Sequence, residues 1–287
     1  MGKYISNFET TAEFEAAEQN LDRPHVSLTK DNMEVHFMPW SDPRVIATFN
    51  VTDTSSATRI MYSYSTSQFS VIEIDGVEQP SVVSTYTFDT LGEHTIKYTL
   101  TDPTSIGNNA FNGCTSLTSI VIPSGVTSIG DGVFFNCSSL TSIDIPSGVT
   151  SIGIGAFQSC SGLTSVTLGN GVTSIGAGVF QDCSGLTTIT IPNTVTSIGI
   201  GAFDGCSSLT SIVIPNSVTS IRERAFRNCS GLTSITVNAT TPPTISGNWY
   251  EFDNTNNCPI YVPSASVNTY KAASGWSVYS NRIQAIS

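Results

Sequence analysis

The chain has 287 residues, of which 11 are Lys or Arg and 22 are Asp or Glu, so its formal net charge is -11. This acidic balance argues against a nucleic-acid partner, because phosphate binding requires clustered Lys and Arg side chains. No stretch approaches the roughly 18 consecutive apolar residues of a membrane span. The first 20 residues contain Glu9, Glu13, Glu15 and Glu18 and no apolar core, so they do not have the pattern of a secretory signal peptide.

Residues 1–40 predict a helix followed by a hairpin. Residues 10–13 have the spacing of a capping box, and residues 14–21 then place apolar side chains on one helical face. Residues 26–28 and 35–37 alternate between apolar and polar side chains, as two paired strands do.

Residues 41–104 predict a small antiparallel β-sandwich. Apolar and polar residues alternate over residues 45–51, 60–64 and 96–100, and turn residues separate these stripes. Residues 86–98 resemble the final hairpin of PKD-type immunoglobulin-like modules. We expect the sandwich to run directly into the next segment and to cap it.

A 23-residue repeat fills residues 105–240 and is the strongest signal in the chain. Six copies follow one another without an insertion, and this predicts a solenoid in which each copy forms one coil. The acidic residues are concentrated before it, with 15 acids and 6 bases in residues 1–105. One recurring series is Phe111, Phe134, Phe157, Phe180, Phe203 and Phe226, and a second is Cys114, Cys137, Cys160, Cys183, Cys206 and Cys229.

Each copy predicts two short strands and one helical turn. In the first copy the strands cover residues 117–122 and 126–129, and Pro123 ends the first of them because proline cannot continue a ladder. Residues 110–114 are expected to form the helical turn. A single coil leaves its apolar interior open on two sides, so coils must stack and the terminal ones need caps. The expected inward side chains are Ile106, Ala110, Phe111, Cys114, Leu117, Ile120, Ile122 and Val126.

The pattern L-T-S-I-x-I-P-x-x-V-T-S-I-G-x-x-A-F-x-x-C resembles the BspA-like, or Treponema-type, bacterial leucine-rich repeats. The resemblance implies a curved solenoid on secreted or surface-exposed proteins that act in adhesion and protein binding without enzymatic activity. The expected fold is therefore a β-rich leucine-rich-repeat solenoid of short strands and helical turns, preceded by a small antiparallel β-sandwich.

Residues 241–287 predict a C-terminal cap. A short strand lies between Pro259 and Pro263, Ser264 can cap a short helix, and residues 282–286 alternate like a last strand. The segment also resembles the usual C-terminal tail of this repeat family.

No residue set in the chain predicts catalysis, a metal or a cofactor. The repeat cysteines are expected to form a ladder of buried thiols, and Cys258 is the odd one of seven. The histidines are His25, His36 and His94, all outside the repeats, and the last two are expected at solvent-facing strand positions. Neither a zinc ligand set nor a nucleophile with its base can be assembled from them.

The candidate binding surface is the outer face of the first strand of each coil. Side chains alternate along a strand, so the outward residues of six coils form two columns. A rigid face of this kind suits an extended protein or glycan, because preorganisation lowers the cost of ordering. A solvated face without a ligand is the alternative. The candidate residues are Ser119, Val121, Ser142, Asp144, Ser165, Thr167, Thr188, Thr190, Ser211, Val213, Ser234 and Thr236.

Two other surface features have weaker interpretations. Arg222, Arg224 and Arg227 form a basic patch that is either solvated or a docking point for the cap or a partner. A strip of threonines resembles the regular hydroxyl arrays that bind ice or crystals. Its members are Thr118, Thr141, Thr164, Thr187, Thr210 and Thr233.

Three functions are compatible with this sequence. The first is a non-enzymatic protein that binds an extracellular protein or glycan at the cell surface. The second is a phage or virion appendage that binds a host surface. The third is a hydrolase with an unrecognised site in residues 1–104, which the lack of a convergent acid, base and nucleophile disfavours.

Overall fold

The structure is a computed structural model that describes residues 26–29, 32–37, 43–245 and 251–286. The chain divides into two units, residues 1–42 and residues 43–287. In the first unit, β1 (Val26–Thr29) pairs with β2 (Asn32–Phe37) in antiparallel orientation, which confirms the predicted hairpin. The helix predicted over residues 10–21 lies outside the described residues.

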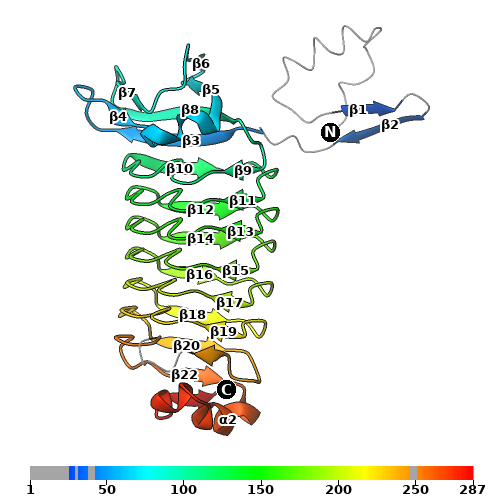
Figure 1. The fold of residues 1–287 in the computed structure, drawn as a ribbon, viewed down its shortest axis with the longest axis vertical. Coiled ribbons are helices and arrows are strands. Elements are labelled where there is room, and N and C mark those ends of the chain that lie inside the picture. Colours follow the sequence, from blue (N-terminus) through cyan, green and yellow to red (C-terminus); the bar gives the residue numbers. More distant parts are fainter. Residues whose placement is uncertain (1–25, 30–31, 38–42, 246–250, 287) are drawn as a thin grey trace. The chain divides into compact units, whose positions relative to one another are not determined.

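The second unit begins with an antiparallel sheet that covers the first coil (Figure 1). Strands β3 and β8 place every second residue in the core, because one face of the sheet packs on the protein and the other faces water. The strand order is β10-β3-β8-β5-β6, and β4 pairs with β7 beside it. The bounds are β3 (Val45–Val51), β4 (Thr58–Arg59), η1 (Ser63–Gln68), β5 (Phe69–Ile74), β6 (Val77–Glu78), β7 (Thr85–Tyr86), β8 (Gly92–Leu100) and β10 (Leu117–Val121).

This sheet is continuous with the solenoid. Strand β10 belongs to the first coil and pairs antiparallel with β3, with Ile120 opposite Ala47. The rings of Phe69 and Tyr98 lie 5.8 and 5.2 Å from the ring of Phe111, the first phenylalanine of the repeat. The sheet therefore closes the open end of the repeat core. The sandwich and the resemblance to a PKD-type module stay a prediction.

His94 is buried, and the prediction that it faces solvent is wrong. The Asp75-Gly76 turn between β5 and β6 folds back beside β8, so His94 Nδ1 lies 2.6 Å from Asp75 Oδ2. The other ring nitrogen lies 3.0 Å from the carbonyl oxygen of Thr90. Burial opposes the charged form, but the hydrogen bonds to Asp75 and Thr90 and the charge of Asp75 outweigh it and raise the pKa of His94 above 6.5.

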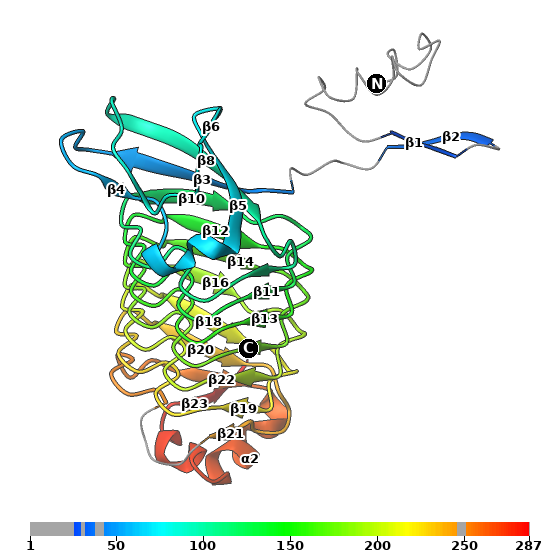
Figure 2. The same cartoon turned by 45° about the horizontal axis from the view of Figure 1, so that its top comes forward.

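The solenoid consists of coils stacked in parallel register (Figures 1 and 2). Each strand residue pairs with the residue one repeat later, as Val166 does with Ile189. The first strands of the coils after β10 are β12 (Ser142–Ile145), β14 (Ser165–Leu168), β16 (Thr188–Thr190), β18 (Ser211–Ile214) and β20 (Ser234–Val237). The second strands are β9 (Ser105–Ile106), β11 (Ser128–Ile129), β13 (Ser151–Ile152), β15 (Ser174–Ile175), β17 (Ser197–Ile198), β19 (Ser220–Ile221) and β21 (Thr244–Ile245).

The predicted helical turns are β-turns in the structure. Amide groups in this segment alternate between a partner in the same turn and a partner in the next coil. The amide of Asn112 donates to the carbonyl of Asn109 at 3.0 Å, whereas the amide of Phe111 donates to Val133 at 2.8 Å. Asn109 also has a left-handed φ of 59°, which a helix does not contain. Bonding to the next coil thus replaces the helical pattern.

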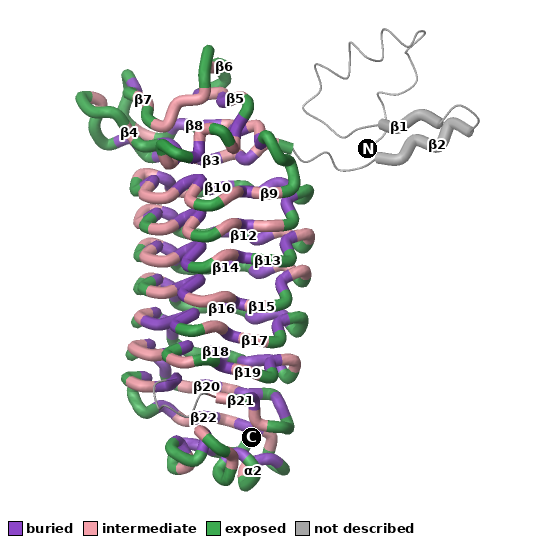
Figure 3. The backbone as a smooth tube through the Cα atoms, viewed as in Figure 1, coloured by how far each residue is buried: buried purple, intermediate pink, exposed green. Residues whose placement is uncertain are grey.

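The core is a ladder of stacked rings enclosed by aliphatic side chains (Figure 3). All eight inward positions predicted for the first coil are buried. Consecutive phenylalanine rings from Phe111 to Phe252 lie 5.1 to 5.7 Å apart. Phe252 extends this ladder although it follows Phe226 by 26 residues and therefore falls outside the 23-residue spacing.

The C-terminal segment closes the other end of the ladder. Strands β22 (Ile260–Val262) and β23 (Ile283–Ala285) continue the parallel sheet of β20, and the helix α2 (Val267–Ala272) follows η2 (Ser264–Ser266). These strands and this helix confirm the predicted elements. Ser264 lies in η2 and does not cap the helix by a side-chain hydrogen bond. In η3 (Trp276–Tyr279), the Trp276 indole covers Phe252 and donates to the Pro243 carbonyl at 2.7 Å.

Replacing a ring in the middle of the ladder should strongly destabilise the fold. Phe157 is fully buried between Phe134 and Phe180, so we expect Phe157→Ala to reduce the free energy of unfolding by about 3–5 kcal/mol. Thr167→Ala in the same coil removes an exposed side chain and should be nearly neutral. Chemical denaturation of both variants tests this, and equal midpoints would contradict the core assignment.

The stability contributed by His94 should depend on pH. Because its folded pKa is raised, the contribution is complete below the unfolded pKa of about 6.5 and is lost as the pH rises through the folded pKa. His94→Gln should therefore cost more stability at pH 5.5 than at pH 8.5. The Asp75→Asn variant should show the same trend when both are measured by urea unfolding. A constant difference from wild type across this range would refute the pairing.

Candidate functional site

The strand-face columns are present in the structure as outward side chains of the first strands. Parallel pairing places Ser142 beside Ser165 and Asp144 beside Thr167, so the residues of neighbouring coils lie in register. Ten of the twelve predicted residues are exposed, while Ser234 and Thr236 are half-buried. The structure thus brings the predicted residues together on one surface, and their role in binding stays a prediction.

The chemistry of this surface is that of small polar groups with two apolar exceptions. Val121 and Val213 expose 61% and 52% of their surface, which is unusual for valine and gives both ends of the surface an apolar contact point. Asp144 is the single charged residue of the twelve. The surface contains none of the Trp, Tyr or Arg side chains that dominate tight protein interfaces.

The threonine strip beside these columns serves the fold. The Thr164 hydroxyl donates to the Thr141 carbonyl of the preceding coil at 3.0 Å, and the other members make the same bond at 3.0 to 3.4 Å. A hydroxyl has one hydrogen to donate, and here it is engaged within the chain. These hydroxyls therefore cannot act as a free donor array, and this removes the support for binding ice or crystals.

The repeat cysteines form the predicted ladder of buried thiols, and all seven cysteines of the chain are unpaired. Each thiol from Cys137 onward donates to a phenylalanine carbonyl of the preceding coil, at sulfur–oxygen distances of 3.0 to 3.2 Å. Burial raises the pKa of Cys160 to about 12 and raises the pKa of Cys183 well above 9. These thiols are structural rather than nucleophilic.

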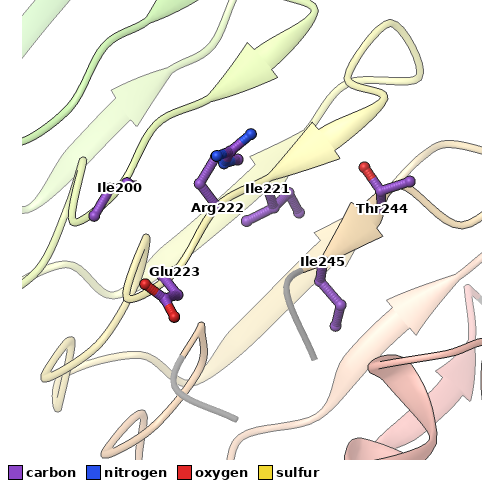
Figure 4. Close-up of a pocket in the computed structure, with 6 residues that line it drawn as sticks. All are labelled: Ile200, Ile221, Arg222, Glu223, Thr244 and Ile245. Atoms are coloured by element: carbon purple, nitrogen blue, oxygen red, sulfur yellow. The ribbon is translucent and has the colours of Figure 1, made fainter. Parts of the chain in front are cut away.

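The basic patch is partly neutralised. Arg227 Nε lies 3.2 Å from Asp204 Oδ2, and Asn228 donates to the other oxygen of the same buried carboxylate at 2.9 Å. Arg222 instead lines a surface hollow of about 340 Å³ beside β19 and β21. Figure 4 shows its lining residues, Ile200, Ile221, Arg222, Glu223, Thr244 and Ile245, which come from three successive coils.

A second hollow, of about 510 Å³, was not predicted from the sequence. It lies between the loop of residues 52–58, Arg59 and the turns of the first two coils at residues 112–116 and Asn136. Its lining is almost entirely polar. Residues so far apart in the chain carry no common motif, and a lone arginine between positions 44 and 97 is the one sequence signal that could have marked the region.

The described residues offer no assembled catalytic or metal centre. No group of three His, Cys, Asp or Glu side chains within them is arranged to hold a metal ion. His94 is engaged by Asp75 and Thr90, as described above. No helix in the described part of the chain is both long and apolar enough to cross a membrane.

Comparison with protein families identifies the repeat. The family model for the BspA type leucine rich repeat region matches residues 81–210 and 196–274, which together make up more than half of the chain. No curated protein matches the sequence significantly.

Several solved structures are similar to the chain. A leucine-rich repeat protein of T. pallidum is 26% identical over 55% of this chain and 68% of its own, with a TM-score of 0.42. A leucine-rich repeat protein of Bacteroides ovatus is 24% identical over 60% of this chain and 50% of its own, with a TM-score of 0.39. A leucine rich cell surface protein of Faecalibacterium prausnitzii is 24% identical over 55% of this chain and 56% of its own, with a TM-score of 0.31. The chain therefore spans about half the length of the last two proteins.

Burial of the thiols predicts that they are unreactive in the folded protein. We expect Ellman's reagent at pH 8 to modify none of the seven cysteines before unfolding, because burial keeps them protonated and out of contact with the reagent. In guanidinium chloride without reductant, all seven should react. A fast-reacting thiol in the native protein, or fewer than seven thiols after unfolding, would contradict the ladder.

Proposed function

The chain belongs to the BspA-type leucine-rich repeat family, and on this premise we propose that it is a non-enzymatic adhesion protein that binds an extracellular protein or glycan through its strand face. Proteins of this family are typically found at the cell surface, which supports a role outside the cell. The strand face is the set of twelve outward residues from Ser119 to Thr236 named above.

One observation carries this proposal: the outward residues repeat in register over six coils. Strand pairing holds neighbouring coils about 4.8 Å apart, so each column extends over more than 20 Å. Both flanks of the face are tied by hydrogen bonds between coils, including those of the threonine strip. An extended partner would therefore meet a surface that needs little ordering upon binding.

The composition of the face indicates the kind of partner. Hydroxyl groups dominate it, and the exposed Val121 and Val213 provide apolar contacts at its two ends. Small side chains allow close approach of a flat or extended ligand, such as a peptide strand or a glycan chain. With few charges on the face, binding should depend only weakly on salt.

A pair of bulky substitutions in the middle of the face tests the proposal. We expect Thr167→Arg with Thr190→Arg to reduce binding at least tenfold to whichever ligand the intact chain selects from combined protein and glycan arrays. Both residues are exposed and neighbouring, so the new side chains obstruct the face without entering the core.

The matched control places the same change elsewhere in the same two coils. Ser161→Arg with Ser184→Arg alters exposed residues outside the strands and should preserve binding. Unfolding midpoints of both double variants should equal that of the wild type. Equal binding by the two double variants would refute the strand face as the binding surface, as would an intact chain that binds nothing on either array.

A further inference from the structure

The polar hollow between the N-terminal sheet and the first two coils has the chemistry of a binding site, and none of the twelve strand-face residues lines it. Its wall includes the side chains of Thr52, Thr58, Thr115, Ser116 and Asn136. None of these side chains forms a hydrogen bond with another described residue. In a chain whose threonine hydroxyls elsewhere bond to neighbouring coils, this concentrates unused donors and acceptors in one place.

The two charged residues of the hollow have different roles. Asp53 accepts three hydrogen bonds, from the amide and hydroxyl of Ser55 and from the hydroxyl of Ser56, at 2.6 to 2.7 Å. It therefore shapes the loop. Arg59 forms no ion pair within the described part of the chain, and its Nη1 has one long contact of 3.5 Å to the carbonyl oxygen of Asn112. Its donors are available to a ligand.

The first coil is adapted to hold Arg59. A Cβ atom at Gly113 would lie 2.9 Å from Arg59 Nη1, so the guanidinium occupies space that only glycine leaves open. The corresponding residues of four other coils have side chains, and one of them is Asn136. This departure from the repeat coincides with the arginine that it accommodates.

An aromatic surface adjoins the hollow through the same arginine. The Arg59 guanidinium carbon lies 5.9 Å from the ring centre of Tyr62, which in turn lies 5.6 Å from that of Tyr64. The Tyr62 amide donates to the Ala110 carbonyl, which fixes this segment to the first coil. Tyr64 exposes 85% of its surface, so one large ring is available to a ligand.

We propose that this hollow, together with Tyr62 and Tyr64, binds a neutral oligosaccharide. Sugar hydroxyls both donate and accept hydrogen bonds, as the free amide and hydroxyl groups of the lining do, and the C–H faces of sugar rings pack on aromatic rings. The opposite charges of Asp53 and Arg59 leave the hollow without net charge, which favours a neutral ligand. More than one sugar ring is needed to occupy the hollow and also reach Tyr64.

The test is binding of the full-length chain to an array of neutral gluco-, galacto- and manno-oligosaccharides beside sialylated and sulfated ones. We expect selection of a neutral oligosaccharide and at least a tenfold loss of affinity in Arg59→Ala and Tyr64→Ala. Gly113→Asn should act like Arg59→Ala, because the new side chain displaces the guanidinium. Its backbone is compatible, since Asn136 and Asn228 occupy this position in other coils with φ of 57° and 58°.

Two controls separate this site from the rest of the molecule. Ser159→Ala changes the position equivalent to Gly113 in the third coil and should leave binding unchanged, as should the strand-face variant Thr167→Arg with Thr190→Arg. Unfolding midpoints confirm that each variant is folded. Selection of anionic glycans only, absence of any bound neutral oligosaccharide, or unchanged affinity in the Arg59, Tyr64 and Gly113 variants would overturn the proposal.

Discussion

The structure of residues 43–287 depends on hydrogen bonding between successive coils in a fixed 23-residue register. A single coil cannot satisfy its backbone or cover its interior, because its amides point toward the coils on either side and its apolar side chains are open at both ends. Once the register is set, identical residues lie over one another, and this aligns the phenylalanine rings, the thiols and the threonine hydroxyls. Each series then reinforces the same register.

Such a ladder has two ends that would expose apolar surface, and the chain closes each end differently. At the N-terminal end, strand β3 pairs with β10 and aromatic rings of the sheet cover Phe111. At the C-terminal end, two further parallel strands, a helix and Trp276 cover Phe252. The repeat continues into this cap after an irregular spacing, so the ladder ends gradually rather than at a boundary.

The regular part and the irregular part of the molecule offer different kinds of surface. Regularity produces a long face of small outward groups, suited to an extended partner and poor in strong anchors. The junction with the N-terminal sheet breaks the repeat and brings together Arg59, Tyr62 and unused polar groups. The two proposed sites are therefore distinct in chemistry, and the variants described for each can be measured on the same full-length protein.

Periodicity in the sequence was sufficient to determine the solenoid, its buried positions and the strand face, because each coil repeats the same local choice of inward and outward residues. The β-turns that replace helical turns depended on bonds to the next coil, which no single copy reveals. Phe252 escaped the 23-residue count, yet stacking placed it in the ladder. The burial of His94 by the Asp75 turn and the polar hollow around Arg59 required the tertiary structure, because both join residues from distant segments whose contacts leave no periodic trace.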